Sequence, residues 1–468
     1  MISRIARKEF IDTWRDGRFR ALAAVLGALA LVATVVGWQH YRAVHAQHAQ
    51  ARQATRAQWL DQGQKNPHSA AHYGVYAFKP KSRLSMLESG IDPYVGVAAW
   101  LEAHKQNEFK FRPAQDRTAL QRFGELTAAE ALLVLMPLFI VLVTFNAFTA
   151  EREQGTLRQL LSLGVRPSQL MAGKALGLGS AVALVVAPIV VAAAVALSAT
   201  ADLGSPVDDV WRALALAVLL IAYLAMWGAG SLAVSARVRS SRRALLTLLG
   251  VWFVTCQIAP RLVADLVAAW QPTPSAATFQ TALDADLADQ SSVEARLQTQ
   301  RQALMAQYGV TSMAQVPVDF SGISLQEGEE HGNEVFDRHF GALGAIHARQ
   351  NRWQTVGGVV APVIAMRTLS MALSATDLAH HRHFADAAEH YRRGIQRTLN
   401  HDIVEHARPG TAYLAGPALW ERIPAFEYDP PPARAVLRQH ATSLAVIGLW
   451  LAAALIFAGV SARRLAAE

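Results

Sequence analysis

The stretch EREQGTLRQLLSLGVRPSQLMAGK, residues 151–174, separates two apolar runs of the chain, residues 131–150 and 175–201. Its leucines recur at the spacing of one helix face, which predicts a short amphipathic helix. They are Leu157, Leu160 and Leu161. A short helix held between two membrane spans is suited to pass motion between the bilayer and a soluble protein. We therefore expect the leucine stripe to bind in a groove of a partner.

The sequence also marks the ends of this short helix. Gly155-Thr156 offers an N-cap, Gly164 is suited to end the helix, and Pro167 cannot continue it. These residues predict one or two helical turns bounded on both sides.

Two glutamates, Glu151 and Glu153, precede the short helix, where carboxylates complement the positive end of a helix dipole. Two interpretations remain open for them. They pair with arginines of residues 1–20 or 237–243, or they lie solvated at the membrane boundary.

The rest of the chain alternates between apolar and polar segments. Its 468 residues are 52% hydrophobic, with a mean hydropathy of +0.18, too low for a protein that lies wholly in a membrane. Six stretches of roughly 17 to 27 residues carry almost no charge, enough to cross a hydrocarbon core about 30 Å thick. We expect the first stretch to be retained as a span, because its apolar run begins late and is longer than that of a signal peptide.

Basic residues gather on one side of these stretches. Lys and Arg are enriched in residues 1–20, 150–174, 237–243 and 463–468, whereas the short connection 199–212 carries three aspartates, Asp202, Asp208 and Asp209, against one arginine. The positive-inside rule then predicts that both termini are cytoplasmic. Membrane topology accounts for much of the net charge of +8. No DNA-binding motif accompanies that charge, so we expect no nucleic-acid partner.

The sequence therefore predicts an all-α polytopic membrane protein with six transmembrane helices and two mainly helical extracytoplasmic insertions. The predicted segments are an amphipathic interfacial helix at 1–20, a first span at 21–41, a first periplasmic segment at 42–126, a second span at 127–149, a cytoplasmic loop with the short helix at 150–174, a third span at 175–198, a short periplasmic loop at 199–212, a fourth span at 213–236, a basic cytoplasmic loop at 237–243, a fifth span at 244–260, a large periplasmic helical domain at 261–440, a sixth span at 441–462 and a cytoplasmic tail at 463–468.

Several local patterns refine this plan. In residues 1–20, an apolar face opposite arginines favours a helix at the membrane surface over a plain charged flank. In the insertions we expect a helix near 95–104, helix starts at the capping boxes Ser291–Glu294 and Ser324–Glu327, and a helix over 377–407. Arg367 interrupts the apolar run 356–375, which predicts a buried or interfacial helix and not a seventh span.

The sequence offers little for catalysis. Gly173-Lys174 is followed by Ala175, so no phosphate-binding loop is present, and neither an HExxH pair nor a GxSxG elbow occurs. We expect no catalytic residue, no cofactor and no enzyme activity in this chain. Cys256, the single cysteine, is expected to fill space inside the fifth span.

Histidines cluster in the second insertion, and His383 and His390 are spaced to share a helix face. This spacing is compatible with a metal site or with a solvated helix face. Interleaved arginines and the absence of an assisting cysteine favour the solvated face, so we predict no metal site. The histidines concerned are His380, His381, His383, His390, His401 and His406.

The residues of the opening stretch resemble the signature of the first cytoplasmic loop of ABC-2 type transporter permeases. The matching residues are Glu151, Glu153, Gly155, Thr156, Leu157, Leu160, Leu161, Gly173 and Lys174. The chain is similar in particular to a bacterial subgroup with enlarged periplasmic loops, in which four further stretches recur. They are 71–74 (AHYG), 100–104 (WLEAH), 122–126 (RFGEL) and 373–377 (LSATD).

The resemblance implies the transmembrane half of an ABC transporter. It further implies assembly with a second permease copy or paralogue and with separate ATPase subunits, which dock on residues 155–163, the coupling helix of that family. Export across the inner membrane is the usual direction there. The alternative is a non-transporting mechanotransmission or regulatory subunit that acts on a periplasmic partner. The size of the two insertions and the scarcity of polar groups in the spans favour that alternative.

Overall fold

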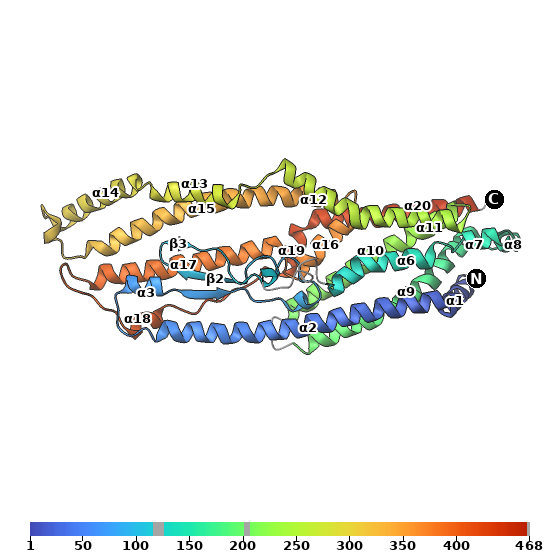
Figure 1. The fold of residues 1–468 in the computed structure, drawn as a ribbon, viewed down its shortest axis with the longest axis horizontal. Helices are drawn as coiled ribbons and strands as arrows, with labels where there is room; N and C mark the ends of the chain where they lie inside the picture. The colour runs from blue at the N-terminus through green and yellow to red at the C-terminus, as the bar shows by residue number, and fades with distance from the viewer. Residues whose placement is uncertain (116–125, 201–205, 466–468) are drawn as a thin grey trace.

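The computed structural model describes residues 1–115, 126–200 and 206–465. The molecule is elongated, with a bundle of long apolar helices at one end and an arm of mostly polar helices at the other (Figure 1). Within the described part of the chain, six helices are long and apolar enough to cross a membrane, which confirms the predicted fold class. They are Gly17–Leu60, Ala128–Glu153, Pro167–Ser198, Val207–Arg237, Ser241–Trp270 and Ala441–Arg464.

The bundle contains these spans and the short elements between them. Its elements are α1 (Ile2–Arg15), α2 (Gly17–Leu60), α5 (Ala128–Glu130), η3 (Ala131–Leu135), α6 (Met136–Thr144), α7 (Thr149–Glu153), α8 (Thr156–Ser162), α9 (Pro167–Ser198), α10 (Pro206–Arg237), α11 (Ser241–Phe253), η5 (Val254–Ile258), α12 (Ala259–Trp270) and α20 (Ala441–Arg464).

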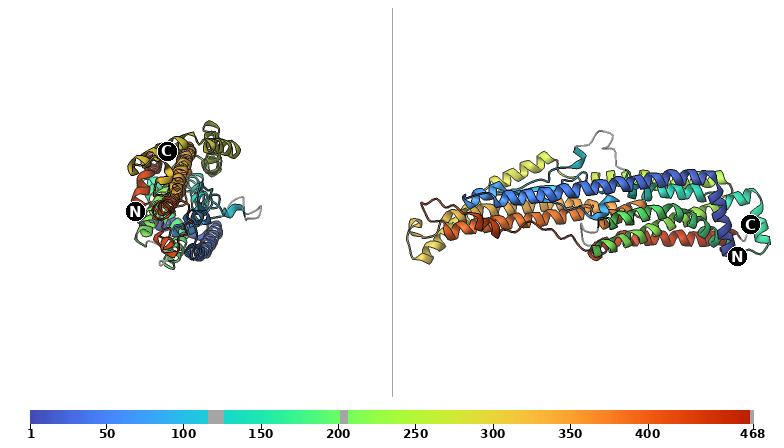
Figure 2. Two further views of the ribbon diagram at one scale, coloured as in Figure 1. Left: turned by 90° about the vertical axis from the view of Figure 1, so that its left-hand side faces the viewer. Right: turned by 90° about the horizontal axis from the view of Figure 1, so that it is seen from below.

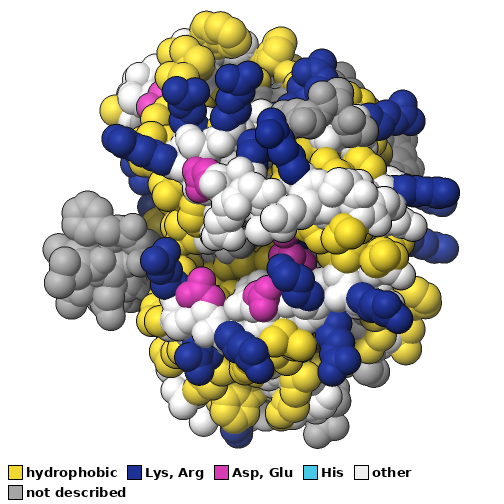
Figure 3. Space-filling view, turned by 90° about the vertical axis from the view of Figure 1, so that its right-hand side faces the viewer, with side chains coloured by type: hydrophobic (Ala, Val, Ile, Leu, Met, Phe, Trp, Pro, Cys, Tyr) yellow, Lys and Arg dark blue, Asp and Glu magenta, His cyan; other side chains and the backbone are white. Residues whose placement is uncertain are grey.

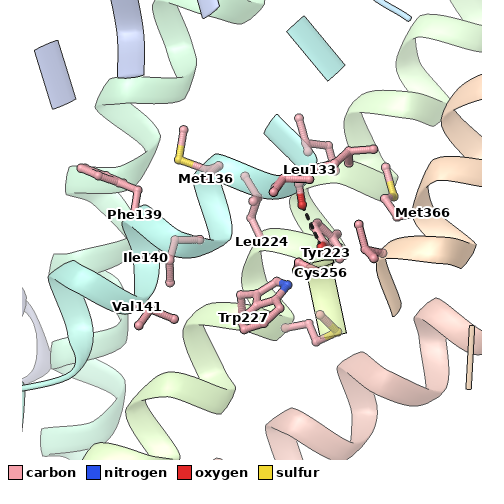
Figure 4. Close-up of a cluster of buried hydrophobic side chains, with 14 of the residues drawn as sticks. Leu133, Met136, Phe139, Ile140, Val141, Tyr223, Leu224, Trp227, Cys256 and Met366 are labelled. Atoms are coloured by element: carbon pink, nitrogen blue, oxygen red, sulfur yellow. Dashed lines mark hydrogen bonds between the residues drawn. The ribbon is translucent and has the colours of Figure 1, made fainter. Parts of the chain in front are cut away.

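Two spans contain a π-helical turn, η3 and η5, shortly before a proline. A proline has no N–H group, so the carbonyl four residues earlier lacks its helical donor. For Pro137 that carbonyl belongs to Leu133, and the Tyr223 hydroxyl donates to it at 3.0 Å within the buried apolar cluster of the bundle (Figure 4). The Trp252 indole donates to the carbonyl of Val134, also at 3.0 Å. Side chains of α10 and α11 therefore satisfy the irregular backbone of the second span.

The arm contains both insertions. Its elements are α3 (Pro67–Tyr73), β1 (Val75–Phe78), η1 (Arg83–Met86), β2 (Ala98–Glu102), β3 (Lys105–Gln106), η2 (Pro113–Gln115), α13 (Ala276–Ala288), α14 (Ser291–Tyr308), η6 (Met313–Gln315), α15 (Phe320–Gly357), α16 (Pro362–Leu373), α17 (Leu378–His406), α18 (Pro417–Arg422) and α19 (Ala433–Gln439).

A small antiparallel sheet in the order β1-β2-β3 replaces the helix predicted near 95–104, and that prediction was wrong. Ala, Leu and Glu in β2 are good helix formers, so local propensity favours a helix there. Pairing with β1 overrides it: Trp100 lies opposite Tyr76, and their rings are 4.6 Å apart. Such cross-strand aromatic pairs stabilise a sheet in a way that only the folded chain provides.

Both predicted capping boxes were also wrong. α14 does begin at Ser291, but the carboxylate of Asp289 accepts the Ser291 amide at 3.1 Å. α15 begins at Phe320 with Asp319 as its N-cap, so Ser324 lies inside the helix. Aspartate took the capping role in each case, which its charge favours at a helix N-terminus. The helix predicted over 377–407 is α17, with Asp377 as its N-cap.

Residues 356–375 do not form a span, as predicted. They contain the end of α15 and the 12-residue helix α16, which is too short to cross a membrane. α16 lies buried against α10 and α20, where the bundle meets the arm. Arg367 of α16 pairs with Glu130 at the start of the second span.

A buried arginine closes the C-terminus of α16. The Arg212 guanidinium donates to the carbonyls of Leu373 at 3.2 Å and of Pro431, and pairs with Asp208 at 2.6 Å. A cation at this position satisfies free carbonyls and complements the helix dipole. Arg212 therefore joins α10, α16 and the segment before α19 at the boundary between bundle and arm.

One helix runs continuously from the bundle into the arm. α2 has 44 residues, a length of about 66 Å at 1.5 Å per residue. At its far end the Trp59 indole donates to the carbonyl of Trp420 at 3.0 Å, and the two buried rings meet edge to face. α2 is thus fixed to the C-terminal part of the arm.

Candidate coupling site at the basic end

The end of the bundle opposite the arm carries both termini, α1, α7, α8 and the α10–α11 connection (residues 238–240); we call it the basic end (Figure 1). Figure 3 shows this face: Lys and Arg side chains dominate its charged groups, with few Asp and Glu.

The backbone around α8 turns sharply at two glycines. Gly155 has φ of 76° and Gly164 has φ of 83°, a left-handed conformation that glycine adopts without steric cost. The Thr156 hydroxyl, at the start of α8, donates to the carbonyl of Glu151 in α7 at 3.2 Å and so holds the turn between the two helices. Pro167 then occupies the first turn of α9. These residues fix α8 as a two-turn helix between two spans.

The leucine stripe of α8 faces the protein's own core. Leu157 is buried with Phe148 and Val165 in a cluster against which Leu160 and Leu161 are partly buried. The opposite side of α8 is exposed, and Leu163 at its end has 78% of its surface accessible. The exposed residues are Arg158, Gln159, Ser162 and Leu163. The stripe therefore anchors α8 to the bundle and leaves a mixed polar and apolar face outward.

Lys174 of α9 lies at the centre of a buried charge triad, which we define as Glu9, Lys174 and Glu151. Its Nζ is 2.8 Å from Glu9 Oε1 and 2.8 Å from Glu151 Oε1. Lys174 is 1% exposed, and Glu9 is 8% exposed. The triad joins α1, α7 and α9. Glu151 therefore pairs with a lysine, which neither of its two open interpretations, an arginine partner or a solvated position, had anticipated.

α1 crosses the end of the bundle and lies directly on α9 (Figure 2). Gly173 and Gly177 permit this contact. A Cβ at Gly173 would lie 2.6 Å from the side chain of Ile5, and one at Gly177 would lie 2.5 Å from the carbonyl oxygen of Ala6. The apolar face of residues 1–20, which was predicted to lie on the membrane surface, therefore packs partly against α9. Gly173 lets the two helices come this close.

α7 is tied to the α10–α11 connection by two adjacent residues. Glu153 accepts the Ser241 amide at 2.8 Å and the Ser241 hydroxyl at 2.9 Å. Arg152 donates to the carbonyls of Val238 at 2.8 Å and Ala236 at 2.7 Å. Glu153 thus contacts a serine at the start of α11 and is itself exposed, which agrees with the solvated interpretation and not with an arginine partner. A displacement of α7 and α8 would reach two further spans through these bonds.

Sequence reasoning missed Glu9 as a member of this site. A detectable signal existed: Glu9 lies four residues after Ile5, on the apolar face of its helix, and a lone acid there is unusual. Lys174 is likewise the one charged residue in a long apolar stretch of α9. Pairing them across 165 positions required the folded structure.

A cavity of about 470 Å³ lies at the arm end of the bundle, with walls that are almost wholly apolar. Residues of α9 and α10 form much of its lining, and Arg83 and Asp209, 2.6 Å apart, provide its ion pair. This cavity suits an apolar molecule, since its few polar groups already contact one another.

Three of the six histidines considered as metal ligands contact three different residues. His380 contacts Asp377 at 2.6 Å, His383 contacts the Tyr428 hydroxyl at 3.0 Å, and His401 contacts Glu405 at 3.1 Å. Among the described residues, the histidines that do converge are His68, His72 and His104, all outside α17.

Comparisons with known families support the resemblance. Residues 102–263 match a family described as ABC-2 family transporter protein. This part of the chain is of the ABC-2 permease type. The matched part of the permease includes α7, α8 and α9. Together with the six apolar helices among the described residues, this match identifies a multi-pass membrane component of a transport system. Residues 276–429, most of the second insertion, match a domain of unknown function, DUF3526. No curated protein matches the permease.

The structure brings together two of the stretches that resemble the subgroup with enlarged loops. The amide of Ala103, in the stretch 100–104, donates to the carbonyl of Ala71, in the stretch 71–74, at 3.2 Å. The stretch 373–377 links α16 to α17. All of the stretch 122–126 except Leu126 lies outside the described residues.

Proposed function

We propose that the permease is the transmembrane subunit of an ATP-driven exporter in a bacterial inner membrane. A separate ATPase subunit would bind the exposed side of α8, and a second copy or a paralogue of the permease would complete the transport unit. One observation carries this proposal: α8 lies at an exposed end of the bundle, with its leucine stripe anchored and its opposite face free.

The charge distribution supports a cytoplasmic position for the basic end. Lys and Arg predominate on that face (Figure 3), whereas the acidic residues Asp208 and Asp209 lie at the opposite end of α10. Basic residues are retained on the cytoplasmic side of bacterial membranes. An ATPase that works in the cytoplasm would then find α8 on its own side.

The contacts of α8 and α7 suggest how the work of the ATPase would reach the spans. Closure of an ATPase dimer would displace α8, and the leucine stripe would transfer this displacement to the helix ends beneath it. Lys174 would carry it to α9 and α1, and Glu153 and Arg152 would carry it to α10 and α11. The permease itself contributes no phosphate-binding loop, so ATP hydrolysis would belong to the partner.

Leu163→Glu tests the docking face. The residue is exposed and makes no core contact in α8, so the substitution should leave membrane insertion intact. We expect it to abolish co-purification of a polypeptide that is labelled by azido-ATP and has a fixed ratio to the permease. Leu414→Glu, at an equally apolar residue of the arm that is 57% exposed, is the matched control. Retention of the labelled polypeptide by Leu163→Glu would refute docking on this face.

Cysteine labelling tests the orientation. In a Cys256→Ser background, Ser162→Cys in α8 and Ser292→Cys in α14 each place one exposed thiol at opposite ends of the molecule. We expect a membrane-impermeant maleimide to label Ser292→Cys in intact spheroplasts and Ser162→Cys only after permeabilisation. The reverse pattern would place α8 outside the cell and exclude a cytoplasmic ATPase as its partner.

The second candidate is a mechanotransmission subunit that acts on a periplasmic partner without moving a substrate. The continuous helix α2 favours it, because one rigid element joins the basic end to the far part of the arm. ATP-dependent substrate flux in proteoliposomes would support the exporter. ATP-dependent change in the arm without flux, for every substrate class tested, would support this alternative.

A further inference from the structure

Three histidines converge in the arm, from two segments of the first insertion. His68 and His72 lie one turn apart on α3, and His104 lies in the turn between β2 and β3. Their ligand nitrogens all lie within 4.8 Å of one another, and the His68 and His72 Nε2 atoms are 3.2 Å apart. His72 and His104 are exposed, so the group opens to solvent.

The spacing fits a tetrahedral divalent cation. Zinc binds imidazole nitrogen at about 2.0–2.1 Å, which separates two ligand nitrogens by roughly 3.3 Å. The pair His68 and His72 already has this separation, and a small rotation of the His104 ring would bring in the third nitrogen. A hydrogen bond between two imidazoles would explain why His68 and His72 lie together, but not why His104 lies beside them.

A buried carboxylate orients the third histidine. The Nδ1 of His104 is 2.8 Å from Glu329 Oε1, which leaves its Nε2 available as a metal ligand. Glu329 is 2% exposed, and its second oxygen accepts the His104 amide at 3.1 Å and the Gln396 side chain at 2.6 Å. A carboxylate bound to the far nitrogen is the usual support of a metal-ligating histidine.

The backbone at His104 supports the same conclusion. Its φ of 65° lies in the left-handed region, where a residue other than glycine is uncommon. The bond from the Ala103 amide to the carbonyl of Ala71 holds this turn against the end of α3. Strained conformations of this kind concentrate at binding sites, where the surrounding structure holds them in place.

We propose that His68, His72 and His104 bind a divalent transition-metal cation, with Zn²⁺ the best fit and Glu329 the positioning residue. Three imidazoles without a thiolate suit Zn²⁺, Ni²⁺ or Cu²⁺ and disfavour Cu⁺. A fourth position would face solvent and bind water or an external ligand. Because Glu329 belongs to α15, the cation would join the first insertion to the second.

Metal titration of the full-length permease tests this site, on protein purified in detergent through a tag without histidines and stripped with a chelator. In competition with a chromophoric chelator, we expect one Zn²⁺ per chain. His72→Ala should weaken binding by more than 100-fold, since it removes a ligand. His401→Ala removes an exposed histidine of α17 that pairs with Glu405, and it should bind as the wild type does. Equal affinity of His72→Ala and wild type would overturn the proposal.

Glu329→Gln separates positioning from ligation. We expect a loss of about 10- to 100-fold in Zn²⁺ affinity. The visible spectrum of bound Co²⁺ should keep its tetrahedral form in this variant and change in His72→Ala. Because His72 is exposed, the metal-free wild type and His72→Ala should melt at the same temperature. Zn²⁺ should then raise the melting temperature of the wild type alone; equal shifts in both would contradict the site.

Discussion

Replacing Lys174 by methionine should release α1 from the bundle. The lysine is 1% exposed and contacts two carboxylates at 2.8 Å, while the Glu9 and Glu151 side chains are 11% and 13% exposed. Removing it leaves Glu151 without its counterion and leaves Glu9 with Lys8 alone, an exposed lysine whose Nζ is 3.3 Å from Glu9 Oε1. Removing one partner of a buried ion pair costs about 3–5 kcal/mol. Since Glu9 belongs to α1 and Glu151 to α7, release of α1 separates the two carboxylates and relieves this cost.

A change of 3–5 kcal/mol shifts the equilibrium between bound and released α1 by roughly 100- to 3,000-fold, at about 1.4 kcal/mol for each factor of ten. Hydrogen exchange detects this shift directly. In full-length permease in lipid nanodiscs, the amides of Ile2–Arg15 should lose protection by at least about 100-fold in Lys174→Met. Amides of α17, in the arm, should exchange as in the wild type and serve as the internal control.

Neutralising the whole triad separates charge from packing. The variant Glu9→Gln, Lys174→Met, Glu151→Gln removes all three charges and keeps nearly the same volume. Replacing buried ion pairs by neutral groups is often close to neutral in free energy, so α1 should regain most of its protection. Unchanged exchange in Lys174→Met, or equal loss of protection in the neutral triple variant, would refute the electrostatic account of this contact.

Three further perturbations test other contacts. Gly177→Ala should detach α1, because an added Cβ would lie 2.5 Å from the Ala6 carbonyl oxygen. Gly179→Ala is the control, since a Cβ at Gly179 has no atom within 4 Å, and hydrogen exchange of α1 compares the two variants. Tyr223→Phe leaves the Leu133 carbonyl without its hydrogen-bond donor and should destabilise the bundle by about 0.6–1.7 kcal/mol. The melting temperature in detergent should fall accordingly, whereas Tyr94→Phe, at an exposed tyrosine, should leave it unchanged. Burial, with the charge of Lys79 nearby, lowers the pKa of His381 to about 4. Unfolding therefore takes up a proton below pH 6.5, and the arm should lose up to about 3 kcal/mol of stability as the pH falls from 6.5 to 4. His381→Leu should remove this dependence, which melting curves at pH 7 and pH 5 measure.

The spans and the ends of α8 were predictable because their signals are local. A long apolar run specifies a membrane helix whatever its neighbours are, so the six spans follow from the sequence. Gly155 and Gly164 mark the ends of α8 because only glycine adopts their backbone conformation freely. In each case the physical cause lies within a few residues of its effect.

The direction of the α8 leucines could not be predicted in the same way. An apolar stripe specifies that one face of a helix is buried, but not which protein buries it. The surroundings of Leu157 come from Phe148, Leu170 and Leu232, and the last of these belongs to another span. The sheet pairing of Trp100 and the convergence of His104 with His68 have the same origin, since each depends on contacts between distant segments.

The helix α2 offers a last test, one that separates the two candidate functions. Ala46 is an exposed residue in its middle, beyond the apolar part of the helix. A proline in a helix interior removes a backbone hydrogen bond and costs about 3 kcal/mol, so Ala46→Pro should bend or break α2 locally, while the exposed position spares the core. Ala46→Ser is the control.

If force passes from the basic end to the arm through α2, binding of ATP to the assembled complex should change hydrogen exchange around Trp59 and Trp420 in the control and not in Ala46→Pro. If the bundle alone performs transport, Ala46→Pro should retain ATP-dependent flux. Loss of flux together with loss of the change at Trp420 would instead make the arm a necessary part of the transport cycle, since the bundle contacts of α8 are untouched by the substitution.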